Sequence, residues 1–222
     1  MLRLENVSRS FAQRGVVLEG LSLNAAEGES ISVMGPSGSG KTTLLNIIGL
    51  LDKPDSGEVF FKDKSLNSLS PDESALYRNR NIGFIFQEHL LLPHLTVMEN
   101  IMLPLFARRL SAEEYKAGYD NAVTLVEKAG ITGLSGKYPF QISGGEAQRV
   151  TLVRSLVNKP DMLLADEPTG SLDSRNAEIM GKLFNEINRD LGIMLLVVTH
   201  SQSLAERMST HYRLENGRLI RY

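Results

Sequence analysis

Two glycine-rich stretches in this sequence each stand directly before a predicted helix, and both have the residue types that bind phosphate. The first, GPSGSGKT, covers residues 35–42, and the second, ISGGE, covers residues 142–146. Glycines let backbone N–H groups approach an anion without a Cβ clash, and the start of a helix favours negative charge. Two such stretches in one chain raise the question of whether they bind the same phosphate.

The first stretch fits the phosphate-loop pattern G-x-x-x-x-G-K-[ST]. It follows an apolar strand predicted over 30–34 and precedes a helical pattern. In this pattern Lys41 would bridge the β- and γ-phosphates, and the hydroxyl of Thr42 would bind Mg²⁺. The sequence therefore predicts a nucleotide and Mg²⁺ site made by Gly35, Pro36, Ser37, Gly38, Ser39, Gly40, Lys41, Thr42 and Thr43.

An acidic pair that could bind a metal or a water molecule lies in LLADEP. Here an apolar strand ends in Asp166 and Glu167, and Pro168 stops the strand. Asp166 is suited to hold hydrated Mg²⁺, and Glu167 is suited to orient or deprotonate a water molecule. Acids are common at exposed strand ends, so the pair alone indicates little. Beside a phosphate loop, it predicts a metal ligand and a catalytic base.

One further motif matches a different class of nucleotide site. NKPD at 158–161 fits the N-K-x-D string with which GTPases read guanine, but it precedes a predicted strand instead of following one. DKPD at 52–55 is a near copy. We interpret both as proline-containing loops that lead into the next element.

The elements that must position these residues alternate between strands and helices. Apolar strand patterns at 30–34, 82–86, 161–166 and 193–198 alternate with helical patterns, which predicts a mostly parallel sheet. Residues from about 88 to 157 are predicted to be mainly helical. Asn216-Gly217 between alternating residues predicts a terminal hairpin.

Composition narrows the class of protein. The chain has 222 residues, 42% of them hydrophobic and 23% charged, as in an ordinary globular domain. A formal net charge of −2 gives no indication of nucleic-acid binding, and the absence of cysteine excludes disulfides and thiolate metal sites. No apolar run approaches the ~20 residues of a membrane-spanning helix, so we expect any action at a membrane to need a partner.

Taken in order, GPSGSGKT, Gln87 after IGFIF, ISGGE, LLADEP, SLD and His200 resemble the motifs of the ATP-binding cassette (ABC) family, over essentially the whole chain. The resemblance implies an α/β fold with a P-loop (RecA-like) core, a small antiparallel β subdomain and an inserted helical subdomain. It implies one domain over 1–222, with the core in 1–87 and 158–222 and the helical subdomain in 88–157. It also implies ATP hydrolysis by a dimer whose sites lie between two subunits.

The resemblance further implies roles for single residues. Gln87 resembles the glutamine that contacts Mg²⁺ and the attacking water, and His200 resembles the histidine that contacts the γ-phosphate. Asp173 resembles the residue that crosses to the other subunit. Phe11 lies where the family has an aromatic residue that stacks on adenine; a core phenylalanine is the alternative.

For the second glycine stretch, the resemblance implies that Ser143, Gly144 and Gly145 bind the γ-phosphate of ATP held by the opposite subunit. The sequence itself also predicts a capping box, in which Ser143 and Glu146 satisfy N–H groups at a helix start. The two interpretations are compatible. The commoner family form is LSGGQ, and the carboxylate of Glu146 near a phosphate site leaves the role of this residue open.

Within the family, RNRNIGFIFQEHLLLPHLTVMENIMLPL resembles the group of lipoprotein-releasing, efflux and cell-division ATPases, and LNIIGLLDKPDSGEV most resembles the lipoprotein-releasing members. This implies a peripheral ATPase at the cytoplasmic face of a bacterial inner membrane, working with separate transmembrane permease subunits. We expect the permease to dock near His89–Leu95, with a buried interior loop as the alternative. An efflux role and a regulatory or scaffolding role at the division site remain alternatives. The soluble DNA-repair ATPases rank last, because the chain has no heptad array.

Overall fold

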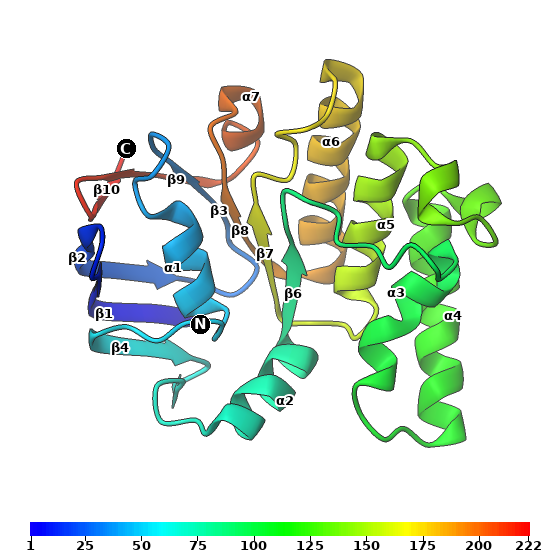
Figure 1. Cartoon of the computed structure of the whole chain (residues 1–222), viewed down its shortest axis with the longest axis horizontal. Helices are drawn as coiled ribbons and strands as arrows, with labels where there is room; N and C mark the ends of the chain where they lie inside the picture. The colour runs from blue at the N-terminus through cyan, green and yellow to red at the C-terminus, as the bar shows by residue number, and fades with distance from the viewer.

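The computed structural model describes all 222 residues and contains two sheets (Figure 1). The larger sheet has six strands, all parallel except for β10 at one edge. In spatial order it consists of β10 (Arg218–Arg221), β9 (Thr210–Glu215), β3 (Ser30–Met34), β8 (Met194–Val198), β7 (Met162–Asp166) and β6 (Ile82–Ile85).

The smaller sheet is antiparallel and has four strands, in the order β2 (Gly15–Ala25), β1 (Leu2–Phe11), β4 (Ser56–Phe61) and β5 (Lys64–Ser65). Figure 1 shows it on one side of the six-stranded sheet, with α1 (Lys41–Ile48) between the two. The predicted α/β fold with a small antiparallel part is therefore confirmed.

The remaining helices occupy the other side of the large sheet or its ends (Figure 1). They are α2 (Pro71–Asn81), α3 (Val97–Phe106), α4 (Ala112–Lys128), α5 (Gly144–Leu156), α6 (Ser174–Leu191) and α7 (Gln202–Ala205), with short 3₁₀ helices at Thr132–Leu134 and Pro139–Gln141. The helical region expected from about residue 88 thus consists of α3, α4 and α5.

The position of β7 between two buried clusters explains why its sequence is apolar without interruption. Met162 and Leu164 pack in a cluster of 25 buried residues around α1 and the small sheet. Leu163 and Ala165 pack in a second cluster of 27 residues with α3 to α6. Successive side chains of a strand point to opposite faces, so a strand covered on both faces is apolar at every position. This double cover holds the carboxyl end of β7, where Asp166 lies, rigidly in place.

One helix and one turn test the sequence predictions directly. The helix α2 was not predicted, although Ser70 caps it, Pro71 opens it and Glu73 completes a capping box. The hairpin at Asn216-Gly217 is confirmed: both residues have positive φ, 47° and 74°, and they join β9 to β10.

Candidate active site

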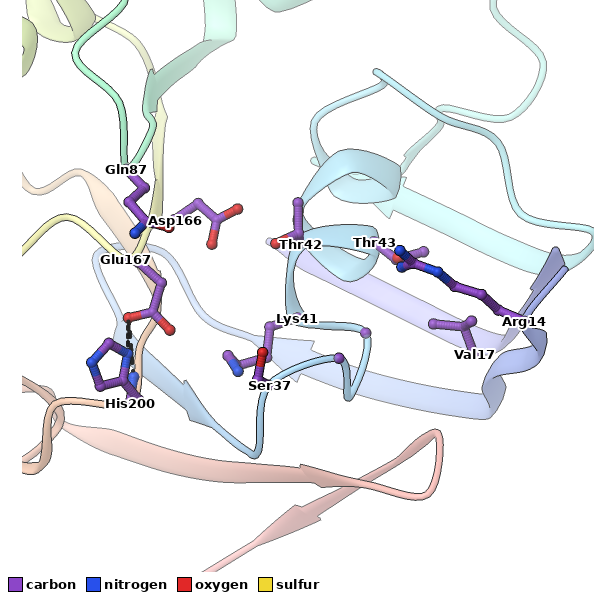
Figure 2. Close-up of a pocket in the computed structure, with 12 residues that line it drawn as sticks. Arg14, Val17, Ser37, Lys41, Thr42, Thr43, Gln87, Asp166, Glu167 and His200 are labelled. Carbon is purple, nitrogen blue, oxygen red and sulfur yellow. Dashed lines mark hydrogen bonds and ion pairs between the residues drawn. The ribbon is translucent and has the colours of Figure 1, made fainter. Parts of the chain in front are cut away.

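A cavity of about 580 Å³ opens at the carboxyl ends of β3 and β7, beside the start of α1 (Figure 2). This is the edge of a parallel α/β sheet at which ligands bind. Its lining residues come from the phosphate loop, from the ends of strands and from the β1–β2 turn. They are Arg14, Val17, Ser37, Gly38, Gly40, Lys41, Thr42, Thr43, Gln87, Asp166, Glu167 and His200.

The phosphate loop reaches the cavity through a left-handed turn at Gly40, whose φ is 104°. A Cβ atom at Gly40 would lie 2.8 Å from Cγ1 of Val17, so only glycine fits there. Gly40 also caps α1 without any side-chain hydrogen bond, which leaves the first N–H groups of the helix free for another acceptor. The hydroxyl of Ser39 in the same loop is buried without a partner. The free N–H groups at the start of α1, whose residues line the cavity, are therefore donors that an anion can approach.

Lys41 is the charged group of this loop, and only 8% of it is exposed. Its ammonium donates to the carbonyl oxygens of Gly35, at 2.8 Å, and of Pro36, at 3.0 Å. These neutral acceptors satisfy the amine but do not neutralise its charge. A phosphate oxygen is a stronger acceptor, because the hydrogen bond would then join two opposite charges.

Asp166 and Glu167 differ in their surroundings although they are adjacent. The carboxylate of Asp166 points toward Thr42 across the cavity (Figure 2). Burial raises the pKa of Asp166, and a hydrogen bond from Thr42 opposes this rise. A cation beside this carboxylate would favour its charged form, so the site is suited to a metal ion.

Glu167 has an unusual backbone, with a positive φ of 45°. Its N–H donates to the carbonyl oxygen of Val198, and its Oε2 accepts from the hydroxyl of Thr199 and the N–H of His200, both at 3.1 Å. Nδ1 of His200 lies 2.8 Å from the same oxygen (Figure 2). The end of β8 thus holds the Glu167 carboxylate in one orientation, while most of the His200 side chain stays exposed.

The structure places the other predicted residues in two further groups. Phe11 lines a second hollow of about 390 Å³ with Ala12, Gln13, Arg14 and Thr43. Arg14 and Thr43 line both this hollow and the main cavity. Phe11 is 36% exposed, so the alternative of a core phenylalanine is wrong.

Ser143, Gly144, Gly145 and Asp173 do not line the cavity of their own chain. They lie together elsewhere, at the starts of α5 and α6, with Asn176 between them. Asp173 caps α6 by accepting from the N–H of Asn176 at 2.8 Å, and a Cβ atom at Gly145 would lie 2.3 Å from the Asn176 side chain. Ser143 and Asp173 are exposed at the surface.

Comparison with known proteins identifies the family. A family model described as ABC transporter matches residues 18–170, which is more than half of the chain. The chain belongs to the ABC transporter family. It is similar to the lipoprotein-releasing system ATP-binding protein LolD of Myxococcus xanthus, with 44% identity over 98% of this chain and 97% of the relative. It is also 40% identical to LolD of Nitratidesulfovibrio vulgaris, over 99% of this chain and 94% of that protein.

Solved structures show the same fold. A dimeric structure of the ATP-binding cassette MJ0796 in a post-hydrolysis state, bound to ADP and Pi, matches with a TM-score of 0.88 and 38% identity, covering 99% of this chain and 96% of that chain. A second dimeric structure of MJ0796 matches with a TM-score of 0.87 and 39% identity, with the same coverage. The cassette is therefore a nucleotide-binding, ATP-hydrolysing subunit of an ABC complex.

The segment expected to meet a permease lies at the surface of the cassette. Leu90 is 56% exposed and Leu92 is 39% exposed, so these two leucines are not part of a buried interior loop. Arg154 of α5 holds the backbone here, donating to the carbonyl oxygens of His89, at 2.9 Å, and Leu90, at 2.8 Å. No helix of the cassette combines the length and apolar composition needed to cross a membrane.

Sequence reasoning missed three residues of the cassette's site. Thr199 binds Glu167, and its only signal was its place beside His200 at the end of an apolar strand. Arg14 lines the cavity from the β1–β2 turn and Val17 from the start of β2, and no motif marks them. The NKPD string lies outside the cavity: Asn158 donates to the carbonyl oxygen of Asn79, and Asp161 pairs with Lys62.

Proposed function

We propose that this cassette hydrolyses ATP with Mg²⁺ as a dimer and drives separate membrane subunits that release lipoproteins. The observation that carries the proposal is the convergence of Lys41, Thr42, Asp166 and Glu167 on one cavity, although the two pairs are more than a hundred residues apart in sequence. Three of these groups bind or balance charge around a triphosphate, and the fourth can accept a proton.

Oxygen ligands suited to Mg²⁺ lie on both sides of the cavity. Thr42 offers a hydroxyl from the start of α1, and Asp166 and Gln87 offer a carboxylate and an amide from the ends of β7 and β6. The cassette has no group of three or more acidic or histidine side chains that could hold a metal alone. Mg²⁺ sites of this kind use one or two carboxylates together with substrate phosphates, so the residues fit. When bound, the metal would neutralise charge on the β- and γ-phosphate oxygens.

Around the triphosphate, Lys41 would exchange its two carbonyl acceptors for phosphate oxygens. Glu167 would take the proton of the water that attacks the γ-phosphate, and Gln87 would orient that water. His200 and Thr199 fix the Glu167 carboxylate through one oxygen, Oε2, which leaves Oε1 as the proton acceptor.

The dimer is proposed as the arrangement that brings Ser143, Gly144 and Gly145 to a nucleotide. None of these residues lines the cavity of its own chain. We infer that these residues, with Asp173, complete the site of a second copy. The dimeric form of the similar cassette MJ0796 supports this arrangement.

The names of the similar LolD proteins support lipoprotein release as the work done. We infer that the cassette does this work at the cytoplasmic face of a bacterial inner membrane, bound to its permease. The exposed leucines of the segment His89–Leu95 are the proposed contact with the permease. An efflux or a division-site role would use the same ATPase cycle. The identity of the membrane partner therefore distinguishes lipoprotein release from these two alternatives.

Two measurements test the proposal. Glu167→Gln is expected to reduce turnover by about a hundredfold or more and to trap an ATP-bound dimer, seen by size-exclusion chromatography with ATP. A variant that hydrolyses ATP at the parental rate would exclude Glu167 as the base.

For the partner, the tagged cassette is purified from a detergent extract of its native membranes. We expect Leu90→Glu to lose the co-purifying permease subunits and keep basal ATPase activity. Leu191→Glu is the matched control, because Leu191 is equally exposed, at 53%, but lies at the end of α6. Recovery of division or efflux proteins instead of a lipoprotein-releasing permease would replace the proposed role.

A further inference from the structure

The hollow beside Phe11 has the position of a nucleobase site. It shares Arg14 and Thr43 with the main cavity, so a ligand whose phosphates lie at the loop can extend into it. Phe11 offers a partly exposed ring there, and aromatic rings bind bases by stacking. This step rests on the proposed function, since it assumes that the nucleotide phosphates occupy the main cavity.

The ring of Phe11 is supported by Arg9. The guanidinium carbon of Arg9 lies over the ring, 4.8 Å from its centre. Arg9 is not among the residues that line the hollow, so it contacts the ring without being part of the hollow's wall. A cation over an aromatic face is attracted by the electrons of the ring and restricts how the ring can turn.

The guanidinium itself is held from two sides by the loop 52–55. Nε and one terminal nitrogen of Arg9 donate to the two carboxylate oxygens of Asp52, at 3.1 and 2.9 Å. The other terminal nitrogen donates to Asp55 at 2.6 Å. Two carboxylates on a planar fork fix both its position and its plane.

Asp55 is in turn tied to the strand that carries the ring. Its second oxygen accepts from the N–H and the hydroxyl of Ser10, both at 2.7 Å. These bonds, with that from Arg9, lower the pKa of Asp55, so the carboxylate stays charged at neutral pH. The DKPD string, which has no part in the phosphate chemistry, thus binds Arg9 and Ser10, the two residues before Phe11.

We propose that Arg9, clamped by Asp52 and Asp55, is a positioning residue for the nucleobase: it fixes the Phe11 ring on which the base stacks. A ring already held in place loses less freedom when the base binds, and this preorganisation increases affinity for the base and not for the phosphates. The loop 52–55 thereby belongs to the nucleotide site although none of its residues lines the hollow or the main cavity.

The test compares ADP, which has a base, with pyrophosphate, which has none, by calorimetric titration with Mg²⁺. Arg9→Gln is expected to weaken ADP binding about two- to tenfold and to leave pyrophosphate binding unchanged. Phe11→Ala is expected to cost about tenfold or more for ADP alone. In the Phe11→Ala background, Arg9→Gln should add nothing, because Arg9 acts through the ring.

Arg3→Gln is the matched control. Arg3 lies on the same strand, and its guanidinium covers the ring of Phe60, 4.4 Å from the centre, away from both cavities. This substitution should leave both ligands unaffected. Should Arg9→Gln fail to fold, Asp55→Asn is expected to weaken ADP binding by a smaller factor and to leave pyrophosphate binding unchanged.

Three results would overturn the proposal: equal weakening of ADP and pyrophosphate, unchanged ADP binding, or an Arg9→Gln effect that persists without the Phe11 ring. Failure of the proposed function gives a different result. In that case Lys41→Ala would leave the binding of pyrophosphate and ADP unchanged, whatever Arg9 does.

Discussion

The helices α1 and α5 both begin at a glycine-rich stretch, yet their first turns are satisfied in opposite ways. At α1, Gly40 provides no side-chain cap. At α5, the hydroxyl of Ser143 accepts from the N–H of Glu146 at 3.3 Å, and the Glu146 carboxylate accepts from the N–H and hydroxyl of Ser143 at 2.7 and 2.8 Å. The start of α1 has no side-chain cap, whereas at α5 the N–H groups of Ser143 and Glu146 are satisfied by side chains of the same helix start.

The two stretches therefore differ in whether their helix needs a ligand at its first turn. An uncapped helix start is less stable by about 1 kcal/mol than a capped one, and a bound anion can replace the missing cap. The phosphate loop therefore leaves the start of α1 uncapped until an anion binds there. The start of α5 is capped before any ligand binds, and the cap leaves the N–H groups of Gly144 and Gly145 for an anion.

The largest predicted effect concerns the uncapped start of α1. Lys41→Ala should lower ATP affinity by about ten- to a hundredfold, because charge-assisted hydrogen bonds to phosphate are lost. Calorimetric titration of the isolated cassette measures this. ATP should also raise the melting temperature of the parental cassette and not that of the variant. Unchanged affinity would mean that the start of α1 is not the nucleotide site.

Next in size is the effect at the capped start of α5. Ser143→Ala should cost about 1 kcal/mol of stability through the lost cap. It should also reduce ATP turnover about tenfold, because one hydrogen-bond donor to the γ-phosphate is removed. Ser111→Ala in α4 is the control, since Ser111 and Glu114 form the same capping box away from the site. Ser111→Ala should lose the same free energy of unfolding and keep the parental ATP turnover. If Ser143→Ala also kept the parental turnover, Ser143 would act only as a helix cap.

The two starts can be tested together by mixing variants. Neither Lys41→Ala nor Ser143→Ala alone should turn over ATP well. In a mixed dimer, one of the two sites would combine an intact Lys41 from one copy with an intact Ser143 from the other, so mixing should restore part of the activity. No gain on mixing would contradict a site shared between two copies.

The smallest effect is expected for Glu146→Gln. Glutamine can keep the capping box, and the loss of a negative charge near the incoming γ-phosphate should favour the ATP-dependent dimer about two- to fivefold. Sedimentation with ATP measures this, and a weaker dimer would show that the carboxylate assists binding.

The same substitution predicts a pH effect. Hydrogen bonds from Ser143 lower the pKa of Glu146 below its ordinary value of 4.5. The ionised box therefore stabilises the fold above that value, and this contribution is lost as the pH falls through the lowered pKa. Glu146→Gln should remove this part of the acid sensitivity, as measured by denaturant unfolding at pH 4 and pH 7.

The sequence was sufficient to locate site residues that lie close together along the chain. The phosphate loop and the Asp166–Glu167 pair could be predicted because each is a short motif beside an apolar strand. The helix α2 could not be found by periodicity, because it has no apolar stripe: Leu76 is exposed, and Ser74 is its only buried residue. Its cap, Ser70 with Glu73, was the signal available.

Contacts between distant parts of the chain were out of reach of the sequence. Arg9 and Asp52 are 43 positions apart, and nothing in either stretch indicates that they meet. The same holds for Thr199 and Glu167, which are brought together because β7 and β8 are neighbours in the sheet. Pairing of strands and ion pairs of this kind depends on the tertiary fold.

The place of β3 in the large sheet has a consequence for the synthesis of the chain. This strand, which leads into the phosphate loop, has β8 and β9 as its two neighbours. Both are made more than 150 residues later. While the ribosome is still adding the middle of the chain, β3 has no partner and the loop has no fixed support. The nascent protein should therefore acquire the ability to hold ATP only when its last strands emerge, and slow long-range pairing should limit that step.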